Sequence, residues 1–427
     1  MWFSGSGPIT AIGGDQLVYN RLAINILEGH GFSQKAQPPF SPSIARTPGY
    51  PAFLTLIYAF FGKENFEAVR FSQIMLMLGS GLILFYIARL IFASWFVAFG
   101  SLVLCYFFPF NYSGKGVYGY LLTESLYMFL VNCTVLFAVL AVKNSRWRDF
   151  ILMAIFCGLG SLTRPANLFF PLAVFTFVLL FMHQSFRRNI GRWFLFLLIV
   201  AAVTVPWTIR NYIVFHKFIP LSVSLSGYRY LYASVNKNPN FIIYPDADFT
   251  KNDVAIPEND LRNAREELRK MFAVFNYGGD GGIQIFEHDK ELKKIGLKLI
   301  KKNPLGFFKL WFYRILGFWH LADLANLING ITKTVNLPSL AAICLKLAFY
   351  AAVIFGYAAF YSNPLANLLL VFPLYNMLIY TPFVPSIRYA LPAFYYLILF
   401  FMVTMWIGTR IVVKKPDCLF KAKNNAA

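Results

Sequence analysis

The 427-residue chain is poor in charged side chains, and acidic ones are the scarcest. Only 14% of its residues are charged, with 19 Asp and Glu against 39 Lys and Arg. About a quarter of a soluble chain is charged, so this composition excludes most soluble domains and also disordered proteins. Hydrophobic residues make up 58% of the chain and aromatic ones 19%, which indicates that its solvent is a lipid bilayer.

The sequence also lacks the motifs of common metal and nucleotide sites. Its five cysteines show no CxxC or other paired spacing, and its five histidines form no HxxxH or HExxH. Neither GxxxxGK[ST] nor GxGxxG occurs, which argues against nucleotide binding. The sequence therefore indicates no cofactor, and it leaves the presence of a divalent metal ion undecided. In a membrane protein, the net charge of +20 indicates anionic lipid or phosphate as a partner rather than nucleic acid.

Long apolar runs predict an all-α polytopic membrane protein with about nine transmembrane helices. The runs lie at 68–88, 95–112, 121–142, 150–163, 166–182, 193–209, 338–361, 364–384 and 389–413. The run 150–163 is too short to cross a bilayer upright, because about 14 residues rise only ~21 Å. We expect it to tilt, or to meet the next helix at a bend around Arg164, because Pro165 disfavours helix at the residue before it.

Short basic loops follow every second run and predict the orientation. They contain Lys143, Arg146 and Arg148, then Arg187, Arg188 and Arg192, and finally Arg410, Lys414 and Lys415. The positive-inside rule makes this side cytoplasmic, so the alternate connections face outward. With nine spans the N-terminus would lie outside, which favours a chain that lacks a first helix.

This orientation predicts five divisions of the chain. They are an outward-facing loop with interfacial helices at 1–67, transmembrane helices at 68–209, a long outward segment at 210–337, further transmembrane helices at 338–413 and a basic cytoplasmic tail at 414–427. In the first loop, 14–29 predicts an amphipathic helix with Leu17, Ala23, Ile24 and Leu27 on one face, followed by a proline-rich turn region. In the long segment, amphipathic helices are expected at 260–275, 284–302 and 304–320.

Six charged residues fall on the predicted outer side, each in a different segment. They are the carboxylates Asp15 and Glu124 and the arginines Arg46, Arg164, Arg210 and Arg388. Arginine offers paired donors that match phosphate oxygens, and a carboxylate beside such a clamp is suited to act as a base. Because nucleotides are cytoplasmic, the phosphate substrate expected on this side is a polyprenyl phosphate in the membrane.

Each of these residues also has a structural alternative. Asp15 would cap a helix, Glu124 would be solvated at a helix end, Arg164 would satisfy carbonyls at a broken helix, Arg210 would anchor at the interface and Arg388 would snorkel. Their convergence on one face favours a functional site, because charges at a membrane edge mark function more often than charges in water.

Six short motifs occur in an order that resembles a known family. They are DxxxY followed by GxGF, RTPGYPxFL, LTESLY, GLxSLTRP, PWTIRN and RYxLP, spread from about residue 14 to 400. The chain resembles polytopic GT-C glycosyltransferases, in particular the protein O-mannosyltransferase-like group that includes lipid A aminoarabinose transferase. The resemblance implies inverting transfer from a polyprenyl-phosphate sugar to a lipid, glycan or protein acceptor. It also implies a multi-pass protein of a bacterial inner membrane with its site facing the periplasm or exterior.

The resemblance also implies roles for individual residues. Asp15 matches the family's general base and Glu124 a second acidic position, while Arg46 matches the contact to the lipid phosphate. Arg164, Arg210 and Arg388 are expected to add phosphate donors, with Tyr19, Tyr50 and Asn211 in support. Gln16 follows Asp15 where the family often has a second acidic residue, which weakens any metal assignment. A transporter or flippase of an anionic lipid-linked substrate is the alternative, although the sequence shows no inverted repeat.

Overall fold

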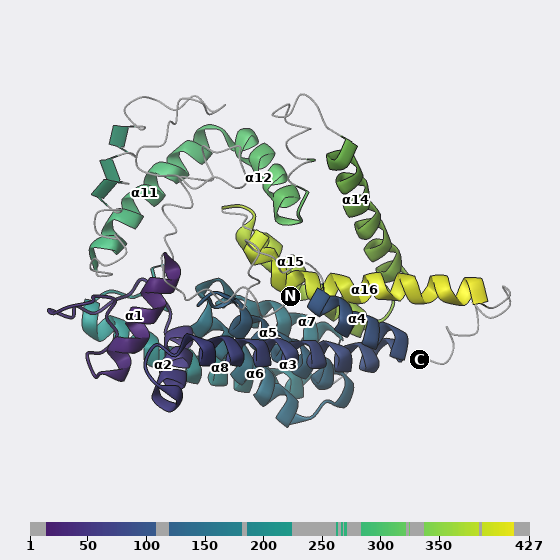
Figure 1. The fold of residues 1–427 in the computed structure, drawn as a ribbon, viewed down its shortest axis with the longest axis horizontal. Coiled ribbons are helices and arrows are strands. Elements are labelled where there is room, and N and C mark those ends of the chain that lie inside the picture. Colours follow the sequence, from purple (N-terminus) through teal and green to yellow (C-terminus); the bar gives the residue numbers. More distant parts are fainter. Residues whose placement is uncertain are drawn as a thin grey trace.

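The protein is described from a computed structural model, which covers 14–107, 119–181, 186–223, 283–321, 337–383 and 387–413, with 262–263, 266–267, 269–270 and 324 in addition. Over these residues every regular element is helical (Figure 1), which confirms the all-α class. The predicted connections at 113–118 and 385–386 and the tail at 414–427 lie outside the described residues, as do most of 224–282.

All nine predicted apolar runs contain helices. They are α3 (Phe66–Phe92), α4 (Trp95–Phe107), α5 (Glu124–Asn144), α6 (Trp147–Thr163), α7 (Phe170–Phe181), α8 (Phe186–Phe215), α14 (Leu337–Ala358), α15 (Pro364–Tyr380) and α16 (Ile387–Val413). By length and composition, five of the described helices can cross a membrane: α3, α5, α8, α14 and α16. That α4, α6, α7 and α15 also cross stays a prediction, because each has fewer than the ~20 residues that an upright span needs.

The short helix α6 ends at the predicted bend. It stops at Thr163, and Arg164 takes an extended conformation with φ −137° and ψ 123°. A 3₁₀ turn at Pro165–Asn167 follows, and α7 begins at Phe170. Proline clashes with a helical conformation of the residue before it, which explains the break and leaves Arg164 outside the helical ladder.

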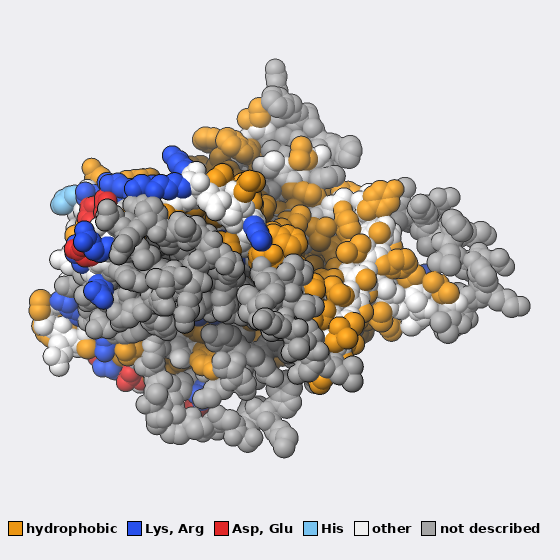
Figure 2. Space-filling model, turned by 90° about the horizontal axis from the view of Figure 1, so that it is seen from above, with side chains coloured by type: hydrophobic (Ala, Val, Ile, Leu, Met, Phe, Trp, Pro, Cys, Tyr) orange, Lys and Arg blue, Asp and Glu red, His pale blue; other side chains and the backbone are white. Residues whose placement is uncertain are grey.

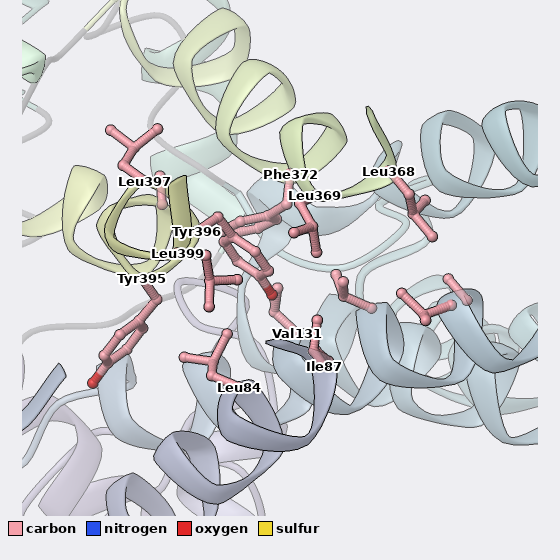
Figure 3. Packing of buried hydrophobic residues seen from close by; sticks show 14 of the residues in the cluster. Leu84, Ile87, Val131, Leu368, Leu369, Phe372, Tyr395, Tyr396, Leu397 and Leu399 are labelled. Carbon is pink, nitrogen blue, oxygen red and sulfur yellow. The ribbon is translucent and has the colours of Figure 1, made fainter. Parts of the chain in front are cut away.

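Helices α5 and α16 form the centre of the bundle. α5 packs against α3 and α6, while α16 packs against α4, α14 and α15. Figure 3 shows apolar side chains of α16 meeting those of three neighbours: Tyr395, Tyr396 and Leu399 approach Leu84 and Ile87 of α3, Val131 of α5 and Phe372 of α15. The Tyr396 hydroxyl donates to Oδ1 of Asn132 at 2.7 Å, so this buried polar group has a hydrogen-bond partner. By contrast, α8 and α14 expose large apolar side chains, which suits contact with lipid.

A helix occupies positions that the sequence analysis did not assign to one. α2 (Gly49–Phe61) begins directly after the proline-rich turn. Pro51 is tolerated because it lies in the first turn, where its missing amide would have no helical partner. Gly49 lies against α6 so closely that a Cβ there would be 2.8 Å from the Leu162 carbonyl oxygen. Thr47 also donates to the Thr163 carbonyl at 2.9 Å, so this contact holds the first loop beside Arg164.

The predicted helix at 14–29 is confirmed as α1 (Asp15–Leu27), which packs against α2. Of the four residues predicted on one face, Ala23 is buried, and Ile24 and Leu27 pack against the same hydrophobic cluster. Asn20 is also buried, where it accepts from the Tyr58 hydroxyl and donates to Glu64, both at 2.7 Å. Asn25 donates to the carbonyls of two loop residues. A hydrophobicity pattern does not predict the burial of Asn20 and Asn25, because hydrogen bonds stabilise it.

Two predicted helices of the long segment are confirmed as α11 (Ile283–Lys302) and α12 (Pro304–Phe318). They lie above the bundle in Figure 1, joined near Asn303, whose side chain accepts from the Gly306 amide. Figure 2 shows lysine and arginine side chains gathered at the end of this face where α11 lies, and apolar side chains toward the other end. The helix predicted at 260–275 falls mostly outside the described residues, and the six described there are helical.

Candidate active site

Five of the six charged residues singled out in the sequence meet at one end of the bundle. Asp15 opens α1 and Glu124 opens α5, so each carboxylate lies in a first helical turn, where the helix dipole favours negative charge. Arg164 follows the last residue of α6, and Arg388 lies in the first turn of α16. Arg46 comes from the loop between α1 and α2. The site therefore assembles from helix ends and one loop, and each contributes one charge.

Asp15 divides its two carboxylate oxygens between two arginines. Its Oδ1 accepts from a terminal nitrogen of Arg46 at 2.7 Å, and its Oδ2 accepts from a terminal nitrogen of Arg388 at 3.3 Å. The Asp15 side chain remains 34% exposed, against 14% for Arg46 and 19% for Arg388. Asp15 thus lies at the open edge of the site, within reach of a solute.

Glu124 holds the enclosed side of the same network. Its Oε1 lies 2.5 Å from a terminal nitrogen of Arg164 and 2.7 Å from Nε of Arg388, and its side chain is fully buried. Arg164 is nearly as enclosed, and its Nε donates to the Thr123 hydroxyl at 2.8 Å. Because removing one member of a buried ion pair leaves an uncompensated charge, Glu124 and Arg164 are expected to stay together.

Arg388 is the residue that joins the two carboxylates. Its Nε faces Glu124 and its terminal nitrogen faces Asp15, so one guanidinium serves both. Three arginines against two carboxylates leave this network with one positive charge. Such a site can accept one further anion without leaving any of its charges uncompensated.

The surroundings of Asp15 keep it ionised. Burial raises the pKa of this carboxyl, but Arg46 and Arg388 lower it further, and the resulting value is about 2. Burial also raises the pKa of Tyr19, one turn along α1, to about 12. At neutral pH Asp15 is therefore an ionised carboxylate that can accept a proton, whereas Tyr19 is a neutral phenol that can donate or accept a hydrogen bond.

Aromatic rings surround the arginines. The Arg46 guanidinium lies 5.9 Å from the ring of Tyr19, which meets Tyr50 edge to face at 5.0 Å. Arg164 lies 4.9 Å from the ring of Tyr127, and Arg388 lies 5.4 Å from that of Tyr389. These cation–π contacts restrict the guanidinium planes while leaving their edges for hydrogen bonds.

Arg210 and Asn211 lie elsewhere. Arg210 donates to the carbonyl of Ser43 at 3.0 Å and to Asn211 at 3.1 Å, and it packs over the ring of Trp207 at 4.9 Å. Asn211 is buried and donates to the carbonyls of Ile219 and Leu221. The hydrogen bond from Arg210 to Ser43 attaches the loop before Arg46 to the end of α8, so Arg210 influences the network only through this loop.

Three further residues belong to this site that were not singled out in the sequence. They are Thr123, Tyr127 and Tyr389, which contact Arg164 or Arg388. Each stood inside a motif used for the family resemblance, directly beside Glu124 or Arg388 or one turn away. These residues were therefore present in the motifs, but a hydroxyl or an aromatic ring near a charged residue is too common in sequences to be singled out without a structure.

Arginines occupy both carboxylates of the site. Within the described residues, no three His, Cys, Asp or Glu side chains gather closely enough to hold a metal ion. The donor set present here consists of guanidinium groups, which bind anions and repel cations. Its chemistry therefore fits a phosphate or a carboxylate.

Together, the helical fold and this network indicate an integral membrane protein with a cluster of arginines and carboxylates at one end of its bundle. Residues 45–209 match the model of the dolichyl-phosphate-mannose-protein mannosyltransferase family. This match confirms the resemblance to GT-C glycosyltransferases that the motifs predicted. It contains Arg46, Glu124 and Arg164, and the structure brings Asp15 and Arg388 to them from outside the matched range.

Comparison with solved structures gives two similar chains, both of ArnT from Cupriavidus metallidurans. The crystal structure bound to undecaprenyl phosphate is 13% identical and has a TM-score of 0.40, covering 92% of this chain and 73% of that one. The apo crystal structure is also 13% identical with the same coverage and has a TM-score of 0.37. Comparison with curated proteins gives no match.

Proposed function

We propose that this protein transfers a sugar from a polyprenyl-phosphate donor to an acceptor hydroxyl or amine, with inversion at the sugar carbon. The observation that carries the proposal is the network of three arginines and two carboxylates at the helix ends. The family match at 45–209 supports the reaction class. The arginines suit the donor phosphate, and Asp15 is the carboxylate that a substrate can reach.

In this mechanism one bond replaces another at the sugar carbon. The acceptor atom attacks this carbon from the side opposite the phosphate, and the bond between the carbon and the phosphate oxygen breaks. The bonding electrons leave with the phosphate, and the acceptor proton passes to Asp15. Arg46, Arg164 and Arg388 stabilise the charge that grows on the leaving phosphate. A single carboxylate acting on the acceptor is the arrangement that inversion requires.

Charge balance supports this division of roles. The donor is a phosphodiester with one negative charge, which matches the single positive charge of the network. After transfer the carrier is a phosphate monoester with up to two negative charges. Asp15 has meanwhile become neutral by taking the proton, so the network carries one more positive charge. The total charge of the site is therefore unchanged by the reaction, which avoids a large electrostatic cost in a membrane.

The direct test is transfer by purified protein from a labelled polyprenyl-phosphate sugar in lipid nanodiscs, with candidate lipid and glycan acceptors supplied together. We expect labelled acceptor and free polyprenyl phosphate to appear in equal amounts. Asp15→Asn should lower the single-turnover rate by roughly 10²–10⁴-fold, and Glu124→Gln should lower it less, because Glu124 orients Arg388. Movement of intact donor between leaflets with no bond broken would instead identify a flippase.

The face on which the reaction occurs is a separate part of the proposal. The basic short loops support a cytoplasmic C-terminus and an external site. A reporter fused after Lys415 should be cytoplasmic, and one inserted near Gly279 should be external. A cytoplasmic reporter at Gly279 would reverse the active face.

A further inference from the structure

Asp15 contacts both Arg46 and Arg388 and remains partly exposed. Its oxygens are 2.7 and 3.3 Å from terminal nitrogens of Arg46 and Arg388, and it is the more exposed of the two carboxylates. Two oxygens on one central atom, each facing a different guanidinium, is also how a phosphate would bridge these arginines. The base and the donor phosphate would thus use the same two hydrogen-bond donors.

We infer that Asp15 competes with the donor phosphate for Arg46 and Arg388, so that donor binding itself releases the carboxylate to act as the base. The inference rests on the proposed function, since it takes the anion to be the phosphate of a polyprenyl carrier. In the donor-free site the carboxylate pairs with both arginines. When the phosphate arrives, it takes over the terminal nitrogens and Asp15 turns toward the acceptor.

Glu124 makes this exchange possible without loss of the site. It contacts Nε of Arg388, a different nitrogen from the one that faces Asp15, and it is fully buried. Arg164 holds Glu124 from the other side and is anchored to the Thr123 hydroxyl. Arg388 therefore keeps its position when Asp15 leaves, and its terminal nitrogen is free for the incoming phosphate. The two carboxylates differ in role because only one can be displaced.

The exchange also changes the strength of the base. While Arg46 and Arg388 hold Asp15, its pKa is about 2, so it is a weak base toward an acceptor hydroxyl. Once the phosphate pairs with the arginines, their lowering effect on Asp15 falls, and its pKa rises. The carboxylate thus becomes a stronger base only when a donor is present. This order disfavours deprotonation of an acceptor at an empty site.

The test measures binding of a short-chain polyprenyl monophosphate, without a sugar, to protein in neutral nanodiscs at pH 7. Asp15→Asn removes the competitor and keeps its shape. If the arginines are free of Asp15 in fewer than about a tenth of molecules, this variant should bind the phosphate at least about tenfold more tightly than wild type. Thermal unfolding should check that every variant compared is folded.

Two controls separate competition from a simple change of charge. Glu28→Gln removes the same charge at the other end of α1, where Glu28 is paired with Lys63 and lies outside the network. It should leave phosphate affinity nearly unchanged. Glu124→Gln removes the same charge within the network but displaces no competitor, so it should tighten binding less than Asp15→Asn does. Equal or weaker binding by Asp15→Asn than by either control would overturn the inference.

The binding result and the transfer result fail independently. Tighter phosphate binding by Asp15→Asn in a protein that transfers no sugar would keep the competition and refute the proposed function. Loss of transfer by Asp15→Asn with no gain in phosphate affinity would keep Asp15 as the base and refute the competition.

Discussion

The two ends of α6 hold similar side chains in different arrangements. At the start of α6, Asp149 is fully buried, with Arg148 at 3.6 Å. Arg192 lies over the rings of Trp147 and Phe150 and donates to the Ser145 carbonyl. At the other end, Arg164 joins a network whose members come from positions 15 to 388. Both ends therefore combine buried carboxylates, arginines and aromatic rings.

The two ends of α6 differ in how far apart in the sequence the interacting residues are. At the start of α6 these residues lie within positions 145 to 192, and their contacts stabilise helix ends and a short turn. The network at the other end aligns several helix ends and a loop so that charges face each other at one open edge. Local contacts of this kind stabilise a fold, whereas long-range alignment of like-charged arginines costs stability and is typical of a binding site. Four experiments test this comparison.

Replacing Arg388 should have the largest effect. Arg388→Met removes the contacts to both Asp15 and Glu124 and leaves the network with no net charge. We expect donor phosphate to bind roughly 10- to 100-fold more weakly, because hydrogen bonds to charged groups are lost. Titration with polyprenyl phosphate measures this, and thermal unfolding checks that Glu124 and Arg164 still support the fold. Unchanged affinity would remove Arg388 from the phosphate site.

A smaller change is expected at Arg46. Arg46→Lys keeps the charge but loses the planar fork, so one of two paired donors to a phosphate is missing. Donor affinity should fall by about 2- to 10-fold, the effect of one modest hydrogen bond. Arg46→Ala should weaken binding further in the same titration. If Arg46→Ala binds the donor as wild type does, Arg46 serves only to pack the loop.

At the opposite end of α6, the effect should be on stability alone. Asp149 lies in the first turn of α6, where a negative charge is favoured. Asp149→Asn should lower the melting temperature by about 2–4 °C and leave the transfer rate unchanged. Asp15→Asn is the matched change at the other end. A loss of transfer in Asp149→Asn comparable to that in Asp15→Asn would mean that the two ends of α6 do not differ in function.

The smallest effect concerns pH. Because the pKa of Asp15 is lowered to about 2 in the folded protein, its ion pairs contribute stability above its unfolded pKa near 4. This contribution falls as the pH drops from about 4 to about 2. The difference in melting temperature between wild type and Asp15→Asn should therefore stay constant between about pH 5 and 8. A difference that changes steadily across this range would mean that Arg46 and Arg388 do not hold the carboxylate.

The sequence predicted the helices better than their contacts. Apolar runs located all nine helices of the bundle, and Pro165 located the break at Arg164, because chain length and backbone sterics act locally. α2 was not predicted because Pro48 and Gly49 were assigned to a turn-rich loop, and the sequence does not reveal the close contact of Gly49 with α6. The burial of Asn20 in α1 was not predicted either, because it depends on a hydrogen bond from Tyr58.

For the site, the sequence indicated which residues collect at one end but not how they pair. The alternation of loops across the membrane placed Asp15, Glu124, Arg164 and Arg388 on one side, yet it could not indicate that Arg388 contacts both carboxylates. This alternation also grouped Arg210 with them, because it assigns a side of the membrane and says nothing of distance across it. Side-chain geometry over a few ångströms decides these pairings, and a one-dimensional pattern does not contain it.

The pairing of Asp15 with Arg388 also has a consequence for how the protein is made. The two residues are separated by 373 positions, so at ribosomal rates of about 5–20 residues per second Arg388 is synthesised roughly 20–75 s after Asp15. During that interval Asp15 has Arg46 as its arginine partner and Glu124 has Arg164, and the bridge between them does not exist. Until Arg388 is made, the network therefore has two arginines against two carboxylates and no net charge. We expect phosphate binding to require insertion of the last helix.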